Sequence, residues 1–178
     1  IKKTSLEAYS RPRTNGITAI TIHDGDRLLN AAITNGKDQI IIAKRSGKAV
    51  HFNEADVRPM GRTAAGVRGV TLEGDNDAVI GMVCINRADA NLLVVSEKGY
   101  GKRSLIDDYR ITHRGGKGVI TINVTDKTGM LVAIKQVTDQ DELMIFNKSG
   151  ISIRIRVDEL RVMGRATQGV RLIKLNDE

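Results

Sequence analysis

The sequence has one cysteine, no tryptophan, two phenylalanines and three tyrosines among its 178 residues. A single cysteine cannot form a disulfide within the chain, and Cys84 lies in the apolar run 80–85, so we expect a buried thiol and a reducing compartment. So few aromatic rings offer little surface for stacking unpaired bases, which argues against single-stranded nucleic acid as a ligand. No segment reaches the ~18 apolar residues of a membrane span, so we expect no membrane partner.

Patterns that would indicate chemistry at a fixed centre are also missing. The three histidines, His23, His51 and His113, have neither metal-ligand spacing nor a neighbouring nucleophile, so we expect them to be surface or loop residues. The acidic run 73–77 lacks the later glutamate that a calcium loop requires and is predicted to be a hairpin tip. We therefore expect no catalytic residue, no metal site and no cofactor in this chain.

The charge balance favours a polyanionic partner. Lysine and arginine number 28 against 21 aspartate and glutamate, which gives a net charge of +7. The sequence pI is about 9.7, a value typical of nucleic-acid binders but shared by many other proteins. The chain opens without an initiator methionine or a signal-peptide core, which predicts that it begins inside a larger protein.

Two sets of glycines recur with one period. Gly16, Gly66, Gly118 and Gly169 are spaced by 50, 52 and 51 residues and each precedes a β-rich stretch. Gly47, Gly99 and Gly150 run in phase with them, and each follows a short polar turn. Two independent markers predict a repeat of about 51 residues, with repeats starting near 47, 99 and 150. We call these residues the marker glycines.

Each period contains four short segments rich in isoleucine and valine, separated by turn residues. In one period they are residues 119–124, 131–137, 142–147 and 151–155, and 17–22 is a further example. Residues 53–57 come closest to helical spacing and are too short for more than one turn. Four strands in about 50 residues make one propeller-like blade. The sequence therefore predicts an all-β, propeller-like fold in which residues 1–178 form a single repeat-array domain of about three and a half blades.

Cations recur at fixed places in the period. They lie before a marker glycine, just after one, or on the strand that opens a repeat. The first group is Arg11, Arg13, Arg58, Arg62, Arg110, Arg114, Lys117, Arg161 and Arg165; the second is Arg68 and Arg171; the third is Lys2, Lys3, Lys48, Lys102, Arg103, Arg154 and Arg156. Equivalent positions of a blade array face the same way, so we expect one basic stripe, with the acidic tips 24–26 and 73–77 elsewhere. Such cations contact phosphates without reading sequence, which predicts sequence-neutral binding of duplex DNA.

The loop 112–118, Thr-His-Arg-Gly-Gly-Lys-Gly, is the sharpest local feature. Gly115, Gly116 and Gly118 allow the backbone to approach a phosphate and offer its N–H groups, while Arg114 and Lys117 supply the countercharge. The stretch from Tyr109 to Gly118, which contains this loop, is two residues longer than the stretch from Tyr9 to Gly16.

These residues resemble a known family, the C-terminal domain of the gyrase A protein, across essentially the whole chain. The resemblance rests on the segments 60–69 and 99–103, on Tyr109 and on 114–119. It implies a β-pinwheel whose blades exchange strands, and a basic rim that wraps duplex DNA so that an ATP-driven enzyme introduces negative supercoils. It further implies assembly with the gyrase A N-terminal domain and gyrase B as A2B2, ATP and Mg²⁺ used elsewhere in that enzyme, and a bacterial, cytoplasmic, nucleoid-associated protein.

The family's hallmark heptapeptide is Gln-Arg-Arg-Gly-Gly-Lys-Gly, the GyrA-box of the first blade. Residues 112–118 keep its last five positions but have Thr112 and His113 in place of Gln and Arg. The resemblance therefore implies a second, box-like copy, with the principal box upstream of Ile1. Two alternatives stay open: the corresponding C-terminal domain of topoisomerase IV, which usually lacks the box, and a propeller that docks proteins.

Overall fold

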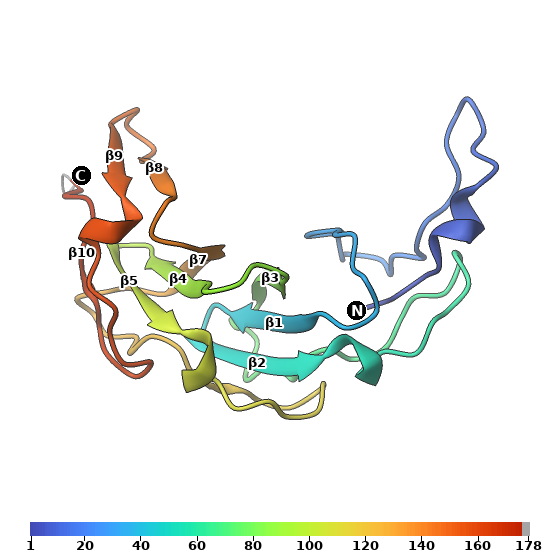
Figure 1. Ribbon diagram of the computed structural model, residues 1–178, viewed down its shortest axis with the longest axis horizontal. Helices are drawn as coiled ribbons and strands as arrows, with labels where there is room; N and C mark the ends of the chain where they lie inside the picture. The colour runs from blue at the N-terminus through green and yellow to red at the C-terminus, as the bar shows by residue number, and fades with distance from the viewer. Residues whose placement is uncertain (176–178) are drawn as a thin grey trace.

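Ten short strands and four single turns of 3-10 helix make up the regular structure of residues 1–175, the part of the chain that the computed structural model describes. The strands are arranged side by side in a crescent, with the N-terminal loops at one end and a β-hairpin at the other (Figure 1). None of the helical turns in these residues is long or apolar enough to cross a membrane. The predicted all-β, propeller-like architecture is confirmed.

The first sheet has the strand order β3-β1-β2-β6 and is antiparallel throughout. Strands β1 (Gln39–Lys44) and β2 (Lys48–Asn53) form a hairpin, with Ile41 opposite both His51 of β2 and Val83 of β3 (Val79–Ile85). The outer strand β6 (Val119–Ile120) comes from the following repeat.

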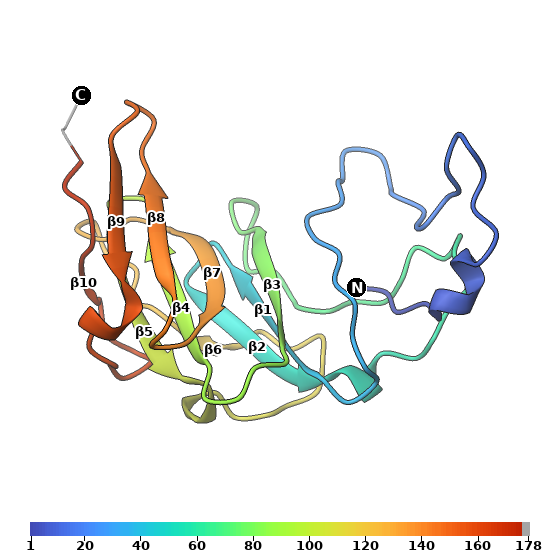
Figure 2. The ribbon, with the colours of Figure 1, turned by 45° about the horizontal axis from the view of Figure 1, so that its top comes forward.

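The second sheet repeats this arrangement with the order β10-β5-β4-β7. Strands β4 (Asn91–Ser96) and β5 (Tyr100–Leu105) form the central hairpin. Strand β7 (Leu131–Val137) pairs with β4 at one edge of the sheet, and β10 (Val170–Arg171) pairs with β5 at the other, outer edge. A third hairpin, β8 (Glu142–Phe146) with β9 (Ser152–Arg156), stands beside this sheet (Figure 2). Each complete sheet therefore receives its outer strand from the next repeat, which is the strand exchange of a pinwheel.

The main core lies between the two complete sheets. Ile41 and Ala43 of β1 and Leu92 and Val94 of β4 are almost fully buried there, together with Ile134 of β7. Burial of such aliphatic side chains contributes roughly 1.5–3 kcal/mol each. Cys84 is buried in a neighbouring cluster with β1 and β2, and burial raises the pKa of its thiol, as expected of a core cysteine.

Most marker glycines lie where distant segments of the chain meet; they are Gly47, Gly66, Gly99, Gly118 and Gly169, whereas, beyond the adjacent residues, nothing in the described chain lies within 4 Å of a Cβ built on Gly16 or Gly150. Gly47 and Gly118 both have the left-handed backbone that favours glycine, with φ of 81° and 84°. A Cβ on Gly47 would lie 2.8 Å from the carbonyl oxygen of Ile122, and one on Gly118 would lie 2.6 Å from that of Ala49. The period read from the sequence therefore marks where one repeat meets the next.

Some of the strands expected from the sequence are confirmed, and others are shorter than expected or absent. Residues 131–137 form β7 as predicted, and 142–147 and 151–155 correspond to β8 and β9 within one residue. The expected strand 119–124 ends at Ile120, because the N–H groups of Thr121 and Ile122 both turn to the carbonyl of Gly47. Residues 17–22 form no strand, since in the described chain their backbone bonds to the loop around Ala64 and to the side chains of Lys2 and Arg62, and pairs with no strand.

The exchange can be tested at Gly118. Gly118→Ala should destabilise the protein by at least ~1–2 kcal/mol, because a side chain is strained in a left-handed backbone and meets the Ala49 carbonyl. The matched control is Gly116→Ala in the same loop, where the nearest atom to a new Cβ is 3.9 Å away. Urea-unfolding midpoints measure both. Equal midpoints for the two variants would contradict this role for Gly118.

Candidate nucleic-acid interface

Three loops of equal length follow the hairpins. Each starts at a buried residue that closes a 3-10 turn, with its N–H bonded back into that turn, and each ends nine residues later at a marker glycine. They run from Val57 to Gly66, from Tyr109 to Gly118 and from Leu160 to Gly169; the turns are Glu54–Asp56, Ile106–Asp108 and Val157–Glu159. All three lie on the outer side of the crescent (Figure 1). We call them the rim loops.

The first arginine of each rim loop is free. Arg58, Arg110 and Arg161 follow the buried starting residue directly, and all three are exposed. None of their side chains makes a hydrogen bond or ion pair within residues 1–175. The backbone at these positions is fixed by the buried neighbour, while the guanidinium groups remain available to an external anion.

The second arginine of each rim loop is used inside the protein. It lies four residues before the marker glycine and donates from a terminal guanidinium nitrogen to the carbonyl two residues after the marker glycine of the preceding repeat. The pairs are Arg62 with Thr18 at 2.7 Å, Arg114 with Arg68 at 3.0 Å, and Arg165 with Ile120. Arg114 and Arg165 also donate from Nε to the carbonyls of Asp56 and Asp108. We call Arg62, Arg114 and Arg165 the inter-repeat arginines; sequence reasoning did not separate them from the free ones.

Two cations predicted to bind DNA are interior residues. Lys102 is 1% exposed, and its ammonium donates to the carbonyls of Gly164 and Arg165 in the next rim loop. Arg103 is 6% exposed, donates to the carbonyl of Leu160 at 2.6 Å and pairs with Asp139. Because neither head group reaches the surface, a direct phosphate contact by Lys102 or Arg103 is excluded in this structure, and that prediction is corrected.

The other cations on the opening strands are engaged as well. Lys2 donates to the carbonyls of Ala19 and Arg62. Lys102, one hundred residues later, likewise donates to the carbonyl of an inter-repeat arginine, Arg165. The rest are paired with acids: Lys3 with Glu54, Lys48 with Glu73, Arg154 with Glu142 and Arg156 with Asp158. The opening strand therefore contributes mainly contacts within the protein to the expected stripe.

The glycine-rich loop 112–118 is bonded into the preceding repeat. The N–H of Gly115 donates to Gly69 at 2.6 Å, so it is not available to a phosphate as the sequence suggested. Thr71 donates from its N–H to Gly116 and from its hydroxyl to Gly115. Within residues 1–175 no acceptor takes the N–H of Gly116 or Lys117, so these two amides remain open to an anion. The Lys117 ammonium is exposed and lies 3.9 Å from the carboxylate of Glu73.

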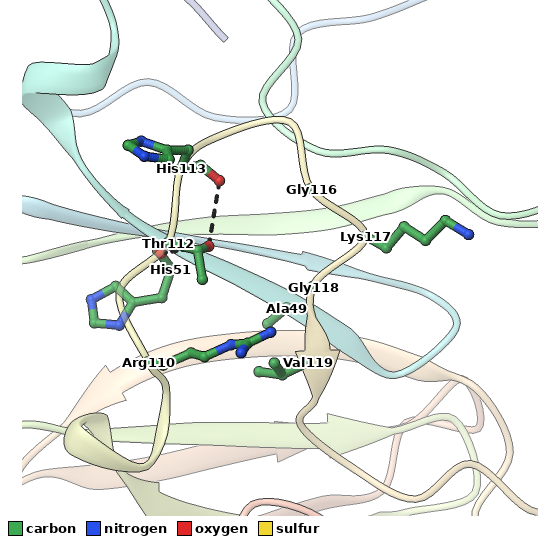
Figure 3. Close-up of a pocket in the computed structure, with 9 residues that line it drawn as sticks. All are labelled: Ala49, His51, Arg110, Thr112, His113, Gly116, Lys117, Gly118 and Val119. Atoms are coloured by element: carbon green, nitrogen blue, oxygen red, sulfur yellow. Dashed lines mark hydrogen bonds between the residues drawn. The ribbon is translucent and has the colours of Figure 1, made fainter.

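A hollow of about 280 Å³ separates this loop from strand β2. In Figure 3 the Arg110 side chain extends beneath the loop toward Gly118, whereas Lys117 points away from the hollow. His51 lines it too and is a buried strand residue, contrary to expectation, with its ring nitrogens 2.7 Å from the carbonyl of Tyr109 and 3.0 Å from Gln39. The loop thus presents cations on two sides.

The remaining predicted cations flank the rim loops. Arg11, Arg13 and Arg68 are exposed, and their side chains have no partner in the described chain. Arg171 donates to the hydroxyl of Tyr100 and lies 5.4 Å from the centre of its ring. In the described residues no cluster of three histidine, cysteine or acidic side chains is placed to hold a metal ion.

Lys44 and Glu73 belong to a cluster of ion pairs that sequence reasoning missed. Lys44 ends strand β1 fully buried, with its ammonium 2.9 Å from Glu73 and 3.3 Å from Asp77. Glu73 is also 2.8 Å from Lys48 and 3.9 Å from Lys117, so the tip 73–77 is not segregated from the basic residues as expected. Only the folded arrangement reveals this, since Lys117 lies 44 residues from Glu73 in sequence.

The whole length of the chain is similar to known proteins. A family model described as "DNA gyrase C-terminal domain, beta-propeller" matches residues 1–35, 38–86, 90–138 and 141–178. The chain is 44% identical to the DNA gyrase A protein of Salmonella typhimurium and 42% identical to that of Chlamydia pneumoniae, over 100% and 99% of its length. It covers 20% and 21% of those proteins, about a fifth of their length.

Two solved structures share the fold. A crystal structure of the C-terminal domain of DNA topoisomerase IV superposes with a TM-score of 0.89 at 22% identity, over 97% of this chain and 54% of that one. A structure of the DNA gyrase A C-terminal domain superposes with a TM-score of 0.82 at 27% identity, over 92% and 55%.

The two classes of rim-loop arginine should respond differently to a change that keeps the charge. Arg62→Lys with Arg165→Lys should lower the thermal midpoint by several degrees, because one ammonium cannot reproduce the fork of a guanidinium. The control is Arg58→Lys with Arg161→Lys, which alters no contact within the described chain and should leave the midpoint within about 1–2 °C. Equal midpoints for both pairs would contradict the inter-repeat role.

Lys102 should make stability depend on pH. Burial, with a smaller effect of Arg165, lowers the pKa of Lys102 from 10.5 to about 8. Between these values the unfolded chain binds the proton and the folded one does not, so stability should rise with pH by up to ~1.4 kcal/mol per unit from pH 8 to 10.5. Below pH 8 both states are charged and the slope vanishes. Urea unfolding against pH should show this rise in wild type and not in Lys102→Met, with the exposed Lys135→Met as the control.

Proposed function

Because this chain belongs to the family of DNA gyrase C-terminal domains, we propose that it binds duplex DNA through the phosphate backbone and wraps the duplex around the outer side of its crescent. The observation that carries the proposal is the recurrence of a free arginine at one position in three successive rim loops: Arg58, Arg110 and Arg161. A cation that recurs at this spacing, on one curved face, suits a curved polyanion. The exposed Arg11, Arg13, Arg68 and Lys117 extend the same surface.

Binding should be neutral to sequence. Base readout requires an element that enters a groove, usually a helix or a β-ribbon. The helical segments of the described chain are single 3-10 turns, and the free cations lie on loops. Arginine and lysine on such loops contact phosphates, so preference among sequences should reflect how easily each bends.

The chain spans about a fifth of the length of its gyrase A relatives, and that kinship supports a place in a larger enzyme. In this proposal residues 1–178 form one array of about three and a half repeats in an ATP-dependent type IIA topoisomerase that introduces negative supercoils. The gyrase A N-terminal domain and gyrase B supply strand cleavage, ATP hydrolysis and Mg²⁺, in the bacterial nucleoid. In this proposal the chain itself cleaves no DNA and its three tyrosines are fold residues: Tyr100 and Tyr109 are buried, Tyr109 bonds to Thr121 in the core, and Tyr9 is half-buried.

A role in topoisomerase IV is the second candidate, favoured by the close superposition on its C-terminal domain. That likeness at 22% identity concerns the fold. The glycine-rich loop 112–118, with Lys117 exposed and two open amides, supports the gyrase assignment. A supercoiling assay of the parent enzyme with and without ATP separates the two.

The free rim-loop arginines should carry a measurable share of DNA affinity. Arg58→Ala, Arg110→Ala and Arg161→Ala together remove three phosphate contacts, so the slope of log K against log salt should become shallower by about 3. The control combines Lys37→Ala, Lys135→Ala and Lys148→Ala, which removes the same charge from exposed lysines outside the rim loops. Fluorescence anisotropy on a duplex over about 50–300 mM salt gives both slopes. Equal slopes in the two triples would point to net charge rather than to these arginines.

The same variants test wrapping. A wrapped duplex changes the linking number that ligase traps in a relaxed circle, and the triple arginine variant should trap less writhe at equal occupancy. Wild-type protein that binds duplex but traps no writhe would contradict wrapping and leave simple binding. A flat salt dependence in wild type would instead favour a propeller that docks proteins.

A further inference from the structure

The carboxylate of Glu73 lies among three lysines. One oxygen is 2.8 Å from the ammonium of Lys48 and 2.9 Å from that of Lys44, and the other is 3.9 Å from that of Lys117. Hydrogen bonds from Lys48 and then Lys44 lower the pKa of Glu73 to about 2, so it is ionised at every physiological pH. A carboxylate held by several ammonium groups occupies the kind of position that a phosphate would take.

The turn that carries Glu73, just before β3, is fixed on both sides. Asp77 accepts from the N–H groups of Ser46 and Glu73, both at 3.0 Å, which ties the tip to the β1–β2 turn. Thr71, two residues before Glu73, is bonded to Gly115 and Gly116 of the glycine-rich loop. The acid is therefore placed by its surroundings beside Lys117.

The lysines differ in what they lose without Glu73. Lys44 is buried and keeps Asp77 at 3.3 Å and the carbonyl of Thr71 at 3.0 Å. Lys48 and Lys117 have no other hydrogen-bond or ion-pair partner in the described chain, and their side chains are 33% and 71% exposed. The open N–H groups of Gly116 and Lys117 lie on the same loop. Lys48 and Lys117 thus form an anion site whose present occupant is Glu73.

We infer that Glu73 is an internal counter-anion that competes with a DNA phosphate for Lys48 and Lys117. The inference rests on the proposed function, since it specifies one phosphate site on that surface. A backbone phosphate that reaches this site must displace the carboxylate from two lysines, whereas Arg58, Arg110 and Arg161 meet DNA unopposed. The glycine-rich loop is accordingly the point on the surface where the chain weakens its own hold on DNA.

The test replaces the charged carboxylate of Glu73 by a neutral amide of nearly the same size. Glu73→Gln should tighten duplex binding about five- to tenfold at about 0.1 M salt and steepen the salt slope by about 1, the value of one additional phosphate contact. The matched control is Glu97→Gln, which removes the same charge from an exposed acid 3.9 Å from Arg45, outside the rim loops. Glu97→Gln should change affinity less than about twofold, since it frees no phosphate site.

A double-mutant cycle assigns the gain to the two lysines. In the background Lys48→Ala with Lys117→Ala, Glu73→Gln should no longer tighten binding. Glu73→Ser serves as a second neutral variant, and Glu73→Asp, which keeps the charge, should give no gain. Urea midpoints of all variants check that they are folded at the assay temperature.

The outcomes separate the two proposals. A gain from Glu73→Gln no larger than from Glu97→Gln, or a gain that persists without Lys48 and Lys117, would overturn the counter-anion. Wild-type protein without salt-dependent duplex binding would overturn the proposed function itself.

Discussion

Strand exchange is the constraint on which the rest of this structure depends. Strand β6 completes the sheet of β1 and β2, and β10 completes the sheet of β4 and β5, so neither sheet is finished by its own repeat. Gly118 makes the first of these contacts possible, because only a residue without a side chain fits against the carbonyl of Ala49. The rim loops that end at Gly118 and Gly169 are consequently anchored in one sheet at their start and, through β6 and β10, in the neighbouring one at their end.

That double anchorage gives the two arginines of a rim loop separate tasks. Arg114 bonds across to Arg68 and Asp56 of the preceding repeat, which helps set the spacing and rotation between blades. Arg110, four residues earlier, is exposed and has no partner in the described chain. The inter-repeat arginine therefore orients the surface, and the first arginine of the loop remains available to bind an anion there. The pattern recurs in the loops of Arg58 and Arg161.

Local patterns in the sequence predicted what depends on local physics. The period, the strand 131–137 and the resemblance to gyrase A all follow from glycine spacing, from branched aliphatic runs and from short motifs. The burial of Lys102 and Arg103 was missed, because their environment is built by residues 160–165 of the next repeat. The proximity of Glu73 to Lys117 was missed for the same reason. Which cations are free is a property of the exchange, and the exchange pairs residues that are distant in the sequence, such as Lys48 with Ile120 and Gly101 with Val170.

The rim loops differ from ordinary surface loops in what they tolerate. Connecting segments usually accept insertions and deletions, because little depends on their length. Here the nine-residue span from Tyr109 to Gly118 leads into β6, whose register on β2 pairs Val119 with Ala49. One residue added or removed would turn the outer strand over and carry the marker glycine away from its carbonyl. The length of these loops is therefore constrained as strictly as their inter-repeat arginine and marker glycine, whereas their exposed positions can change in composition.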